Sequence, residues 1–132
     1  MKNELLLLME RVTSLKSQLE ERSKLWYWYR EHPRRIIKQP IDESVRLTDM
    51  QALDLLIDWV EEALDESNEK KKLEKIARLY ALSKSVFDEV KRVLELGEVV
   101  DRLDSLRKKT NDTAVFENLT KCYEDAIGMF RE

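Results

Sequence analysis

Hydrophobic residues recur along this chain with alternating three- and four-residue spacing, which is the period of an amphipathic α-helix. The first such stretch predicts a helix over residues 3–31, because Pro33 disfavours helical conformation in the residue before it. Its apolar seam follows heptad spacing and is interrupted only by Arg22. We expect the first part of this seam to bind a second copy of the chain through Leu5, Leu8, Val12, Leu15 and Leu19.

A connection over residues 32–47 precedes the second predicted helix, which begins with a strong local signal. Thr48 and Gln51 have the spacing of a capping box, in which each side chain bonds the other residue's backbone amide. We expect Thr48→Ala to destabilise the protein more than Asp49→Ala, since Asp49 would act only through the helix dipole. Apolar residues then alternate by three and four, and the polar run 65–68 ends the helix.

The third predicted helix is the longest and begins near Glu69. Two adjacent apolar rows run through it, which is typical of a central helix that packs against several neighbours. A glycine inside a helix costs only about 1 kcal/mol relative to alanine, so we expect the helix to continue through Gly97 to about Lys108. A Thr-Asn-Asp-Thr turn follows, and a fourth helix is predicted over residues 113–131.

These elements predict an all-α fold, a four-helix bundle formed by a single domain over residues 1–132. Helices 1 and 3 are expected to be long, helices 2 and 4 short, and the connection between helices 1 and 2 long. With only 2 Gly and 2 Pro, the chain has too few turn residues for an all-β fold. Because the long helices would extend beyond the short ones, part of their apolar seam would stay uncovered, which favours a homodimer.

Composition excludes several classes of protein. No apolar run approaches the ~18 residues of a membrane span, and the N-terminal leucines lack a cleavage site, so we expect a cytoplasmic protein without membrane contact. A single Cys and a single His exclude a multi-cysteine or two-histidine metal site within one chain, and we expect neither a metal nor a cofactor. The excess of Glu and Lys over Gln and Asn favours a thermophilic source.

Four consecutive aromatic residues, at positions 26–29, introduce a basic segment. Heptad spacing predicts that Trp26 and Tyr29 are core residues. Successive helical residues differ by about 100° in direction, so one neighbouring helix cannot bury all four rings. We expect the rest of the segment to bind a partner, through Tyr27, Trp28, Arg30, Arg34, Arg35 and Lys38.

Two classes of partner fit the basic aromatic segment 26–38. Aromatic rings beside cations can stack nucleic-acid bases and bind phosphates. Exposed large aromatic residues also mark protein–protein interfaces, and the chain's net charge of −3 opposes long-range attraction to a polyanion. Protein is therefore the favoured partner. The alternative is a small helical nucleic-acid-associated accessory or mobile-element protein.

Two other features have simpler interpretations than a site. Carboxylates lie on successive turns of the second predicted helix without any Glu-x-x-His motif, so we expect a solvated acidic face. These carboxylates are Asp54, Asp58, Glu61, Glu62 and Asp65. Cys122 has no activating base near it in the sequence and is interpreted as a small, half-buried apolar residue.

The function expected from these observations is a non-enzymatic protein–protein interaction or assembly module. No motif supports an active site inside the bundle. Self-association through the first helix is the expected mode of assembly, and the basic aromatic segment is the expected site for another protein.

Overall fold

The computed structural model describes residues 2–26, 28–29, 37–38 and 46–131. The helices are α1 (Lys2–Ser23), α3 (Asp49–Asp65), α4 (Glu69–Lys109) and α5 (Thr113–Arg131), and the strands are β1 (Ile37–Lys38) and β2 (Arg46–Leu47). The all-α prediction is confirmed, and the three helices that follow residue 48 have nearly the predicted extents. None of the helices in the described part of the chain has a stretch long and apolar enough to cross a membrane.

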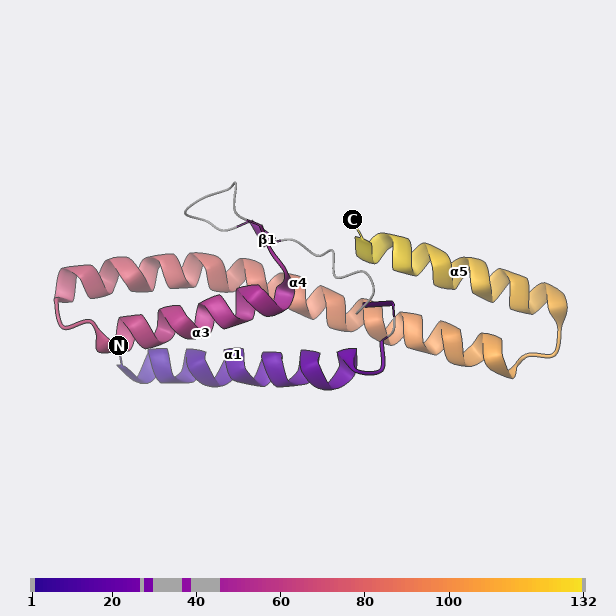
Figure 1. The fold of residues 1–132 in the computed structure, drawn as a ribbon, viewed down its shortest axis with the longest axis horizontal. Helices are drawn as coiled ribbons and strands as arrows, with labels where there is room; N and C mark the ends of the chain where they lie inside the picture. The colour runs from indigo at the N-terminus through magenta and orange to yellow at the C-terminus, as the bar shows by residue number, and fades with distance from the viewer. Residues whose placement is uncertain (1, 27, 30–36, 39–45, 132) are drawn as a thin grey trace.

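The central element is α4, which spans about 60 Å. Its N-terminal half packs beside α1 and α3, with α3 antiparallel to both, and α5 folds back along its C-terminal half (Figure 1). The molecule is therefore elongated, with a three-helix part and a two-helix hairpin joined by α4. The connection between α1 and α3 is described in part, and there β1 pairs antiparallel with β2, with Ile37 opposite Leu47.

The core lies where α1, α3 and the middle of α4 meet. It is built from aliphatic residues at the three- and four-residue spacing that the sequence shows. The residues of α3 and α4 that have no solvent-exposed surface are Ala52, Leu53, Leu56, Val60, Ala63, Leu79, Leu82, Val86, Val90, Val93 and Val100. Lys16 of α1 adds a surface ion pair with Asp54 of α3, with 2.6 Å between Nζ and Oδ1.

The first helix is shorter than predicted, because it ends at Ser23 rather than near residue 31. Two hydrogen bonds between residues three apart, rather than four, follow its last turn. They run from the Leu25 amide to the Arg22 carbonyl and from the Trp26 amide to the Ser23 carbonyl. The chain then bends so that the Trp26 ring enters the core. Helix propensities differ by less than about 1 kcal/mol per residue, whereas burying an aromatic side chain contributes more. Tertiary packing therefore decides where α1 ends.

The predicted capping box at the start of α3 is confirmed. The Thr48 hydroxyl accepts a hydrogen bond from the Gln51 amide at 3.2 Å, and the Gln51 side-chain carbonyl accepts one from the Thr48 amide at 3.0 Å. Asp49, the first residue of α3, differs from its predicted role because it is buried and accepts a hydrogen bond from the Tyr29 hydroxyl. It therefore contributes more than an interaction with the helix dipole.

We accordingly expect Asp49→Ala to destabilise the protein by about 1–3 kcal/mol, because it leaves a buried hydroxyl without this acceptor. Thr48→Ala should cost about 0.5–2 kcal/mol through loss of the cap. Glu69→Ala is the matched control, since Glu69 is an exposed acidic residue in the first turn of α4. Urea denaturation of the three variants measures these effects, and an Asp49→Ala effect as small as that of Glu69→Ala would show that the burial of Asp49 contributes nothing.

Candidate protein-binding groove

The aromatic residues that follow α1 form a buried cluster. Trp26 and Trp28 stack with their ring centroids 5.3 Å apart, and Tyr29 packs edge-on against both at 6.1 and 6.2 Å. All three side chains are buried. The prediction of Trp26 and Tyr29 as core residues is confirmed, and the expectation that Trp28 is exposed is wrong. Its role as a partner contact stays a prediction. Stacking on Trp26 supplies the burial that a single neighbouring helix could not.

The Trp26 ring rests directly on Gly97, which lies inside α4. A Cβ atom added to Gly97 would overlap three carbons of the indole ring. The continuation of the helix through Gly97, which the sequence predicts, is confirmed. The reason for the glycine is the close approach of Trp26, since any side chain at position 97 would push the ring away from α4.

Polar groups surround this contact and orient it. The Trp26 indole donates a hydrogen bond from Nε1 to Oδ2 of Asp101 at 2.6 Å. Partial burial of Asp101 raises the pKa of its carboxyl, and the neighbouring Asp104 and Glu98 act in the same direction, although the bond from Trp26 opposes them. Arg22 at the end of α1 forms an ion pair with Glu98. Burial, reinforced by Asp49, raises the pKa of Tyr29.

Most of the other predicted partner-binding residues lie outside the described part of the chain. Tyr27, Arg30, Arg34 and Arg35 lie outside the described residues. Lys38 is placed by its backbone, which pairs with Arg46 between β1 and β2. The described part of the segment therefore joins α1 to α4 and contributes to the core.

The predicted self-association seam is covered within its own chain. Leu5, Leu8, Val12 and Leu19 are buried in the three-helix core, and Leu15 packs against it half-buried. The shorter α1, with 22 residues, also extends only little beyond α3, the 17-residue helix against which it packs. A partner that binds α1 must therefore contact residues beside the seam.

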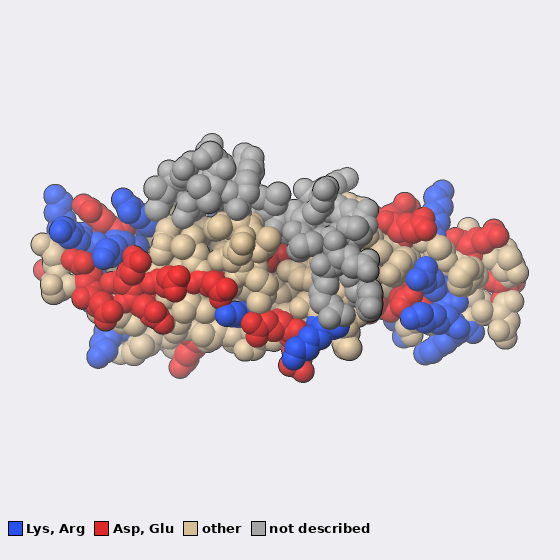
Figure 2. Space-filling model, in the orientation of Figure 1, with Lys and Arg blue, Asp and Glu red and all other residues tan. Residues whose placement is uncertain are grey.

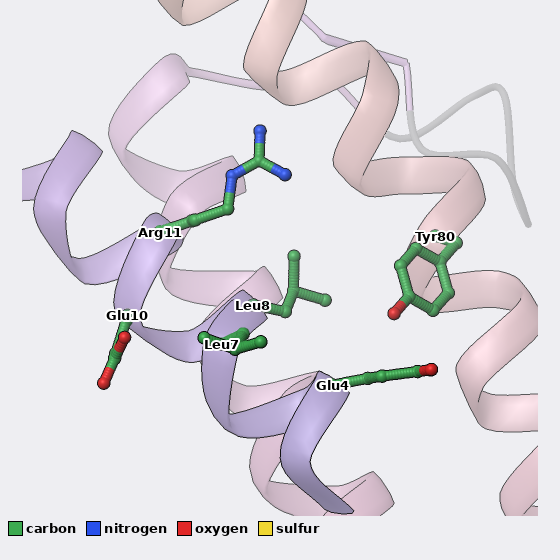
Figure 3. Close-up of a pocket in the computed structure, with 6 residues that line it drawn as sticks. All are labelled: Glu4, Leu7, Leu8, Glu10, Arg11 and Tyr80. Atoms are coloured by element: carbon green, nitrogen blue, oxygen red, sulfur yellow. The ribbon is translucent and has the colours of Figure 1, made fainter. Parts of the chain in front are cut away.

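Such residues line a groove between α1 and α4, with α3 behind them (Figure 3). The groove has two adjoining parts, with volumes of about 370 and 300 Å³, which share Leu8, Arg11 and Tyr80. The first part is lined in addition by three residues of α1, and the second by four residues of α4. These additional residues are Glu4, Leu7 and Glu10, and Ser83, Lys84, Phe87 and Asp88.

The groove has an apolar floor and a charged rim. Leu8 is buried at its base, while Leu7 and Tyr80 are 60% and 45% exposed on its two sides. The Ser83 hydroxyl donates to the Leu79 carbonyl at 2.6 Å, so its hydrogen is used within α4. The Arg11 guanidinium lies over the Phe87 ring, 4.7 Å from its centroid. The rim carries both cations and carboxylates, which suits a partner with both signs of charge.

An apolar row on α4 extends the groove towards the N-terminal end of that helix. Leu73, Tyr80 and Phe87 are spaced by seven residues and therefore lie on one side of α4. Leu73 is exposed, Tyr80 is exposed, and Phe87 is half-buried. At 1.5 Å per residue the row covers about 21 Å, which is the length of four helical turns.

The sequence contained the signal for this groove. The row through Leu73, Tyr80 and Phe87 belongs to the wide apolar face predicted for the third helix. Its exposure could not be predicted, because α1 and α4 contact each other little and α3 packs between them from one side. One side of the wide face is left without a neighbouring helix among the described elements.

The structure also shows where the carboxylates of α3 and the single cysteine lie. All five carboxylates predicted to form a solvated face of α3 are exposed, and Figure 2 shows acidic side chains spread over this part of the molecule. The described residues contain no group of three or more His, Cys, Asp or Glu that could hold a metal ion. Cys122 is exposed on α5, so its prediction as half-buried is wrong.

Comparisons with family models, with curated proteins and with solved structures find no match to this chain.

Proposed function

We propose that this protein is a non-enzymatic interaction module that binds an amphipathic helix of a partner protein in the groove between α1 and α4. The supporting observation is the groove between two parallel helices, in which Leu7 and Tyr80 are exposed and Phe87 is half-buried (Figure 1). A fourth helix laid in this groove would complete a bundle around α1, α3 and α4.

The shape and chemistry of the groove favour a helix over other ligands. An amphipathic helix presents apolar anchors at i, i+3 or i+4 and i+7, and the seven-residue spacing of the row on α4 matches that repeat. Tyr80 is the expected energetic centre, because a partly exposed aromatic residue that becomes buried on binding is typical of interface hot spots. Arg11 and Lys84 on the rim would pair with acidic residues on the partner, and Glu4 and Asp88 with basic ones.

A selection of 15-residue amphipathic peptides displayed on phage tests this function. Peptides enriched on the wild-type chain should carry apolar residues at helical spacing. Tyr80→Ala and Leu7→Asp should each weaken their binding about tenfold or more, a loss of ~1.4 kcal/mol. Leu25→Asp is the matched control, because Leu25 is 82% exposed and lies outside the groove.

Circular dichroism of each variant would show that the fold is intact, since the substituted side chains are exposed. Recovery of peptides whose binding is equal for wild type, Tyr80→Ala and Leu7→Asp would overturn the proposal. So would a selection that enriches only peptides without helical spacing.

A further inference from the structure

The hairpin of α4 and α5 buries little of its own apolar surface. Among the residues of α5 whose burial is described, 113–129, only Ala126 is buried. Val99, Leu106, Val115 and Met129 are between 37% and 52% exposed, and Cys122 is exposed as well. In a pair of helices, each helix is covered by its neighbour on one side only. A hairpin that extends beyond the three-helix part therefore has an apolar face that another layer could cover.

These residues lie on one side of the hairpin. Val99 and Leu106 are seven residues apart and share a side of α4. Val115, Cys122 and Met129 are likewise spaced by seven on α5. α5 runs antiparallel to α4, and both helices are right-handed, so the row on α4 and the row on α5 face the same side of the hairpin (Figure 1). This side is opposite to the side of α4 where Trp26 rests on Gly97.

The half-buried Leu103 and Leu119 lie between the two rows and make the face continuous. The Arg107 guanidinium lies over the Tyr123 ring, 4.0 Å from its centroid, and this contact sets the register of the hairpin. Leu106 and Cys122 are consequently level with each other near the middle of the face. We refer to Val99, Leu103, Leu106, Val115, Leu119, Cys122 and Met129 as the hairpin face.

The two ends of the hairpin carry opposite charge. Residues 106–121, which form its tip, contain four Lys or Arg and two Asp or Glu. Residues 95–105 and 122–131, which form its base, contain six Asp or Glu and two Lys or Arg. Figure 2 shows basic side chains gathered over the C-terminal end of α4. A partner that complements this hairpin is acidic where the tip lies and basic where the base lies.

A second copy of the hairpin, turned end for end, has this charge distribution and the same apolar face. We propose that two copies of the chain pair through their hairpin faces, antiparallel about a two-fold axis that passes near Leu106 and Cys122, and so form an intermolecular four-helix bundle. The contact is isologous, so the same residues serve both partners. Parallel pairing would place the two basic tips together, and the charges therefore select the antiparallel arrangement. The inference does not rest on the proposed function, since the groove lies between α1 and the N-terminal half of α4.

Sedimentation equilibrium from ~1 to ~100 µM tests this pairing, because the dissociation constants of protein interfaces extend from picomolar up to micromolar values. Wild type should be a dimer at the upper concentration. Leu106→Glu should raise the dissociation constant at least tenfold, because it places two carboxylates close to the two-fold axis. Tyr80→Glu, in the groove, is the matched control and should leave it unchanged. A wild-type monomer at ~100 µM overturns the proposal, and so does a dimer that Tyr80→Glu disrupts and Leu106→Glu does not.

Thiol crosslinking gives a second, independent measurement. Cys122 is the only cysteine of the chain, so a short bis-maleimide can join two copies only there. Efficient crosslinking of wild type is expected, because Cys122 lies near the proposed axis. Moving the thiol with Cys122→Ser and Glu124→Cys turns it about 160° around α5 and should abolish the product. Preferential crosslinking from position 124 would place the interface on another side of α5 and overturn the proposal.

Discussion

Gly97→Ala is expected to destabilise this protein by about 1–3 kcal/mol, although alanine is the better helix former. The intrinsic preference for alanine inside a helix is about 1 kcal/mol. The new methyl group would overlap the six-membered part of the Trp26 ring, which is buried and rigid. Relieving that overlap requires the ring or the helix to move, and overpacking of this kind costs more than the propensity gains.

The matched control is Gly128→Ala, because Gly128 also lies inside a helix but the added Cβ would meet no side chain or other segment of the described residues within 4 Å. It should stabilise the protein by about 0.5–1 kcal/mol through the lower entropy of its unfolded chain. Urea denaturation of both variants gives the two signs. If Gly97→Ala stabilised the protein as much as Gly128→Ala does, Trp26 could not rest on Gly97.

Trp26→Ala is expected to be the most destabilising change in the described part of α1 and its junction, by about 3–5 kcal/mol. The substitution removes the largest fully buried side chain among the described residues, its stacking on Trp28 and its hydrogen bond to Asp101. Leu25→Ala, one residue earlier, should change stability by less than about 0.5 kcal/mol, because Leu25 is exposed. Thermal and urea denaturation would both show this contrast between neighbouring residues.

Combining the two substitutions isolates the contact itself. In the Trp26→Ala background the ring is absent, so Gly97→Ala should change sign and stabilise the protein by up to about 1 kcal/mol. Trp26→Phe provides a milder background, in which a ring remains but the Nε1 bond to Asp101 is lost. Equal effects of Gly97→Ala in all three backgrounds would mean that residues 26 and 97 do not interact.

The two proposed surfaces have separate consequences for assembly. The groove between α1 and α4 would take a partner helix at one end of the molecule, and the hairpin face would join two copies at the other. α4 contributes to both, and its 41 residues hold the two surfaces in a defined relation. A dimer formed through the hairpin would then present two grooves, which would let it bind two partner helices at once.

Local signals accounted for the fold class and for most helix boundaries. The start of α3 depends on Thr48 and Gln51, which bond each other within one turn, and the end of α4 depends on the Thr-Asn-Asp-Thr turn that follows. Such boundaries involve neighbours in the sequence and could be predicted. The apolar rows of α4 were also visible, including the row that forms one side of the groove.

The end of α1 and the composition of both candidate surfaces required the tertiary structure. Heptad spacing continues past Ser23 into the aromatic segment, and nothing local shows that the chain bends there. The bend depends on Gly97, more than 70 residues away, which provides the space for Trp26. Exposure likewise depends on distant elements, since none of the described helices covers the row through Tyr80.

The sequence by itself therefore determined the elements of this protein, because three- and four-residue spacing, caps and turn residues act within a few residues along the chain. It determined that α4 has more apolar surface than one neighbour can bury. The tertiary structure alone decided which part of that surface is covered. Packing of Trp26 on Gly97, and of α3 between α1 and α4, joins residues far apart in sequence, and the spacing within one helix carries no information about the helix that packs against it.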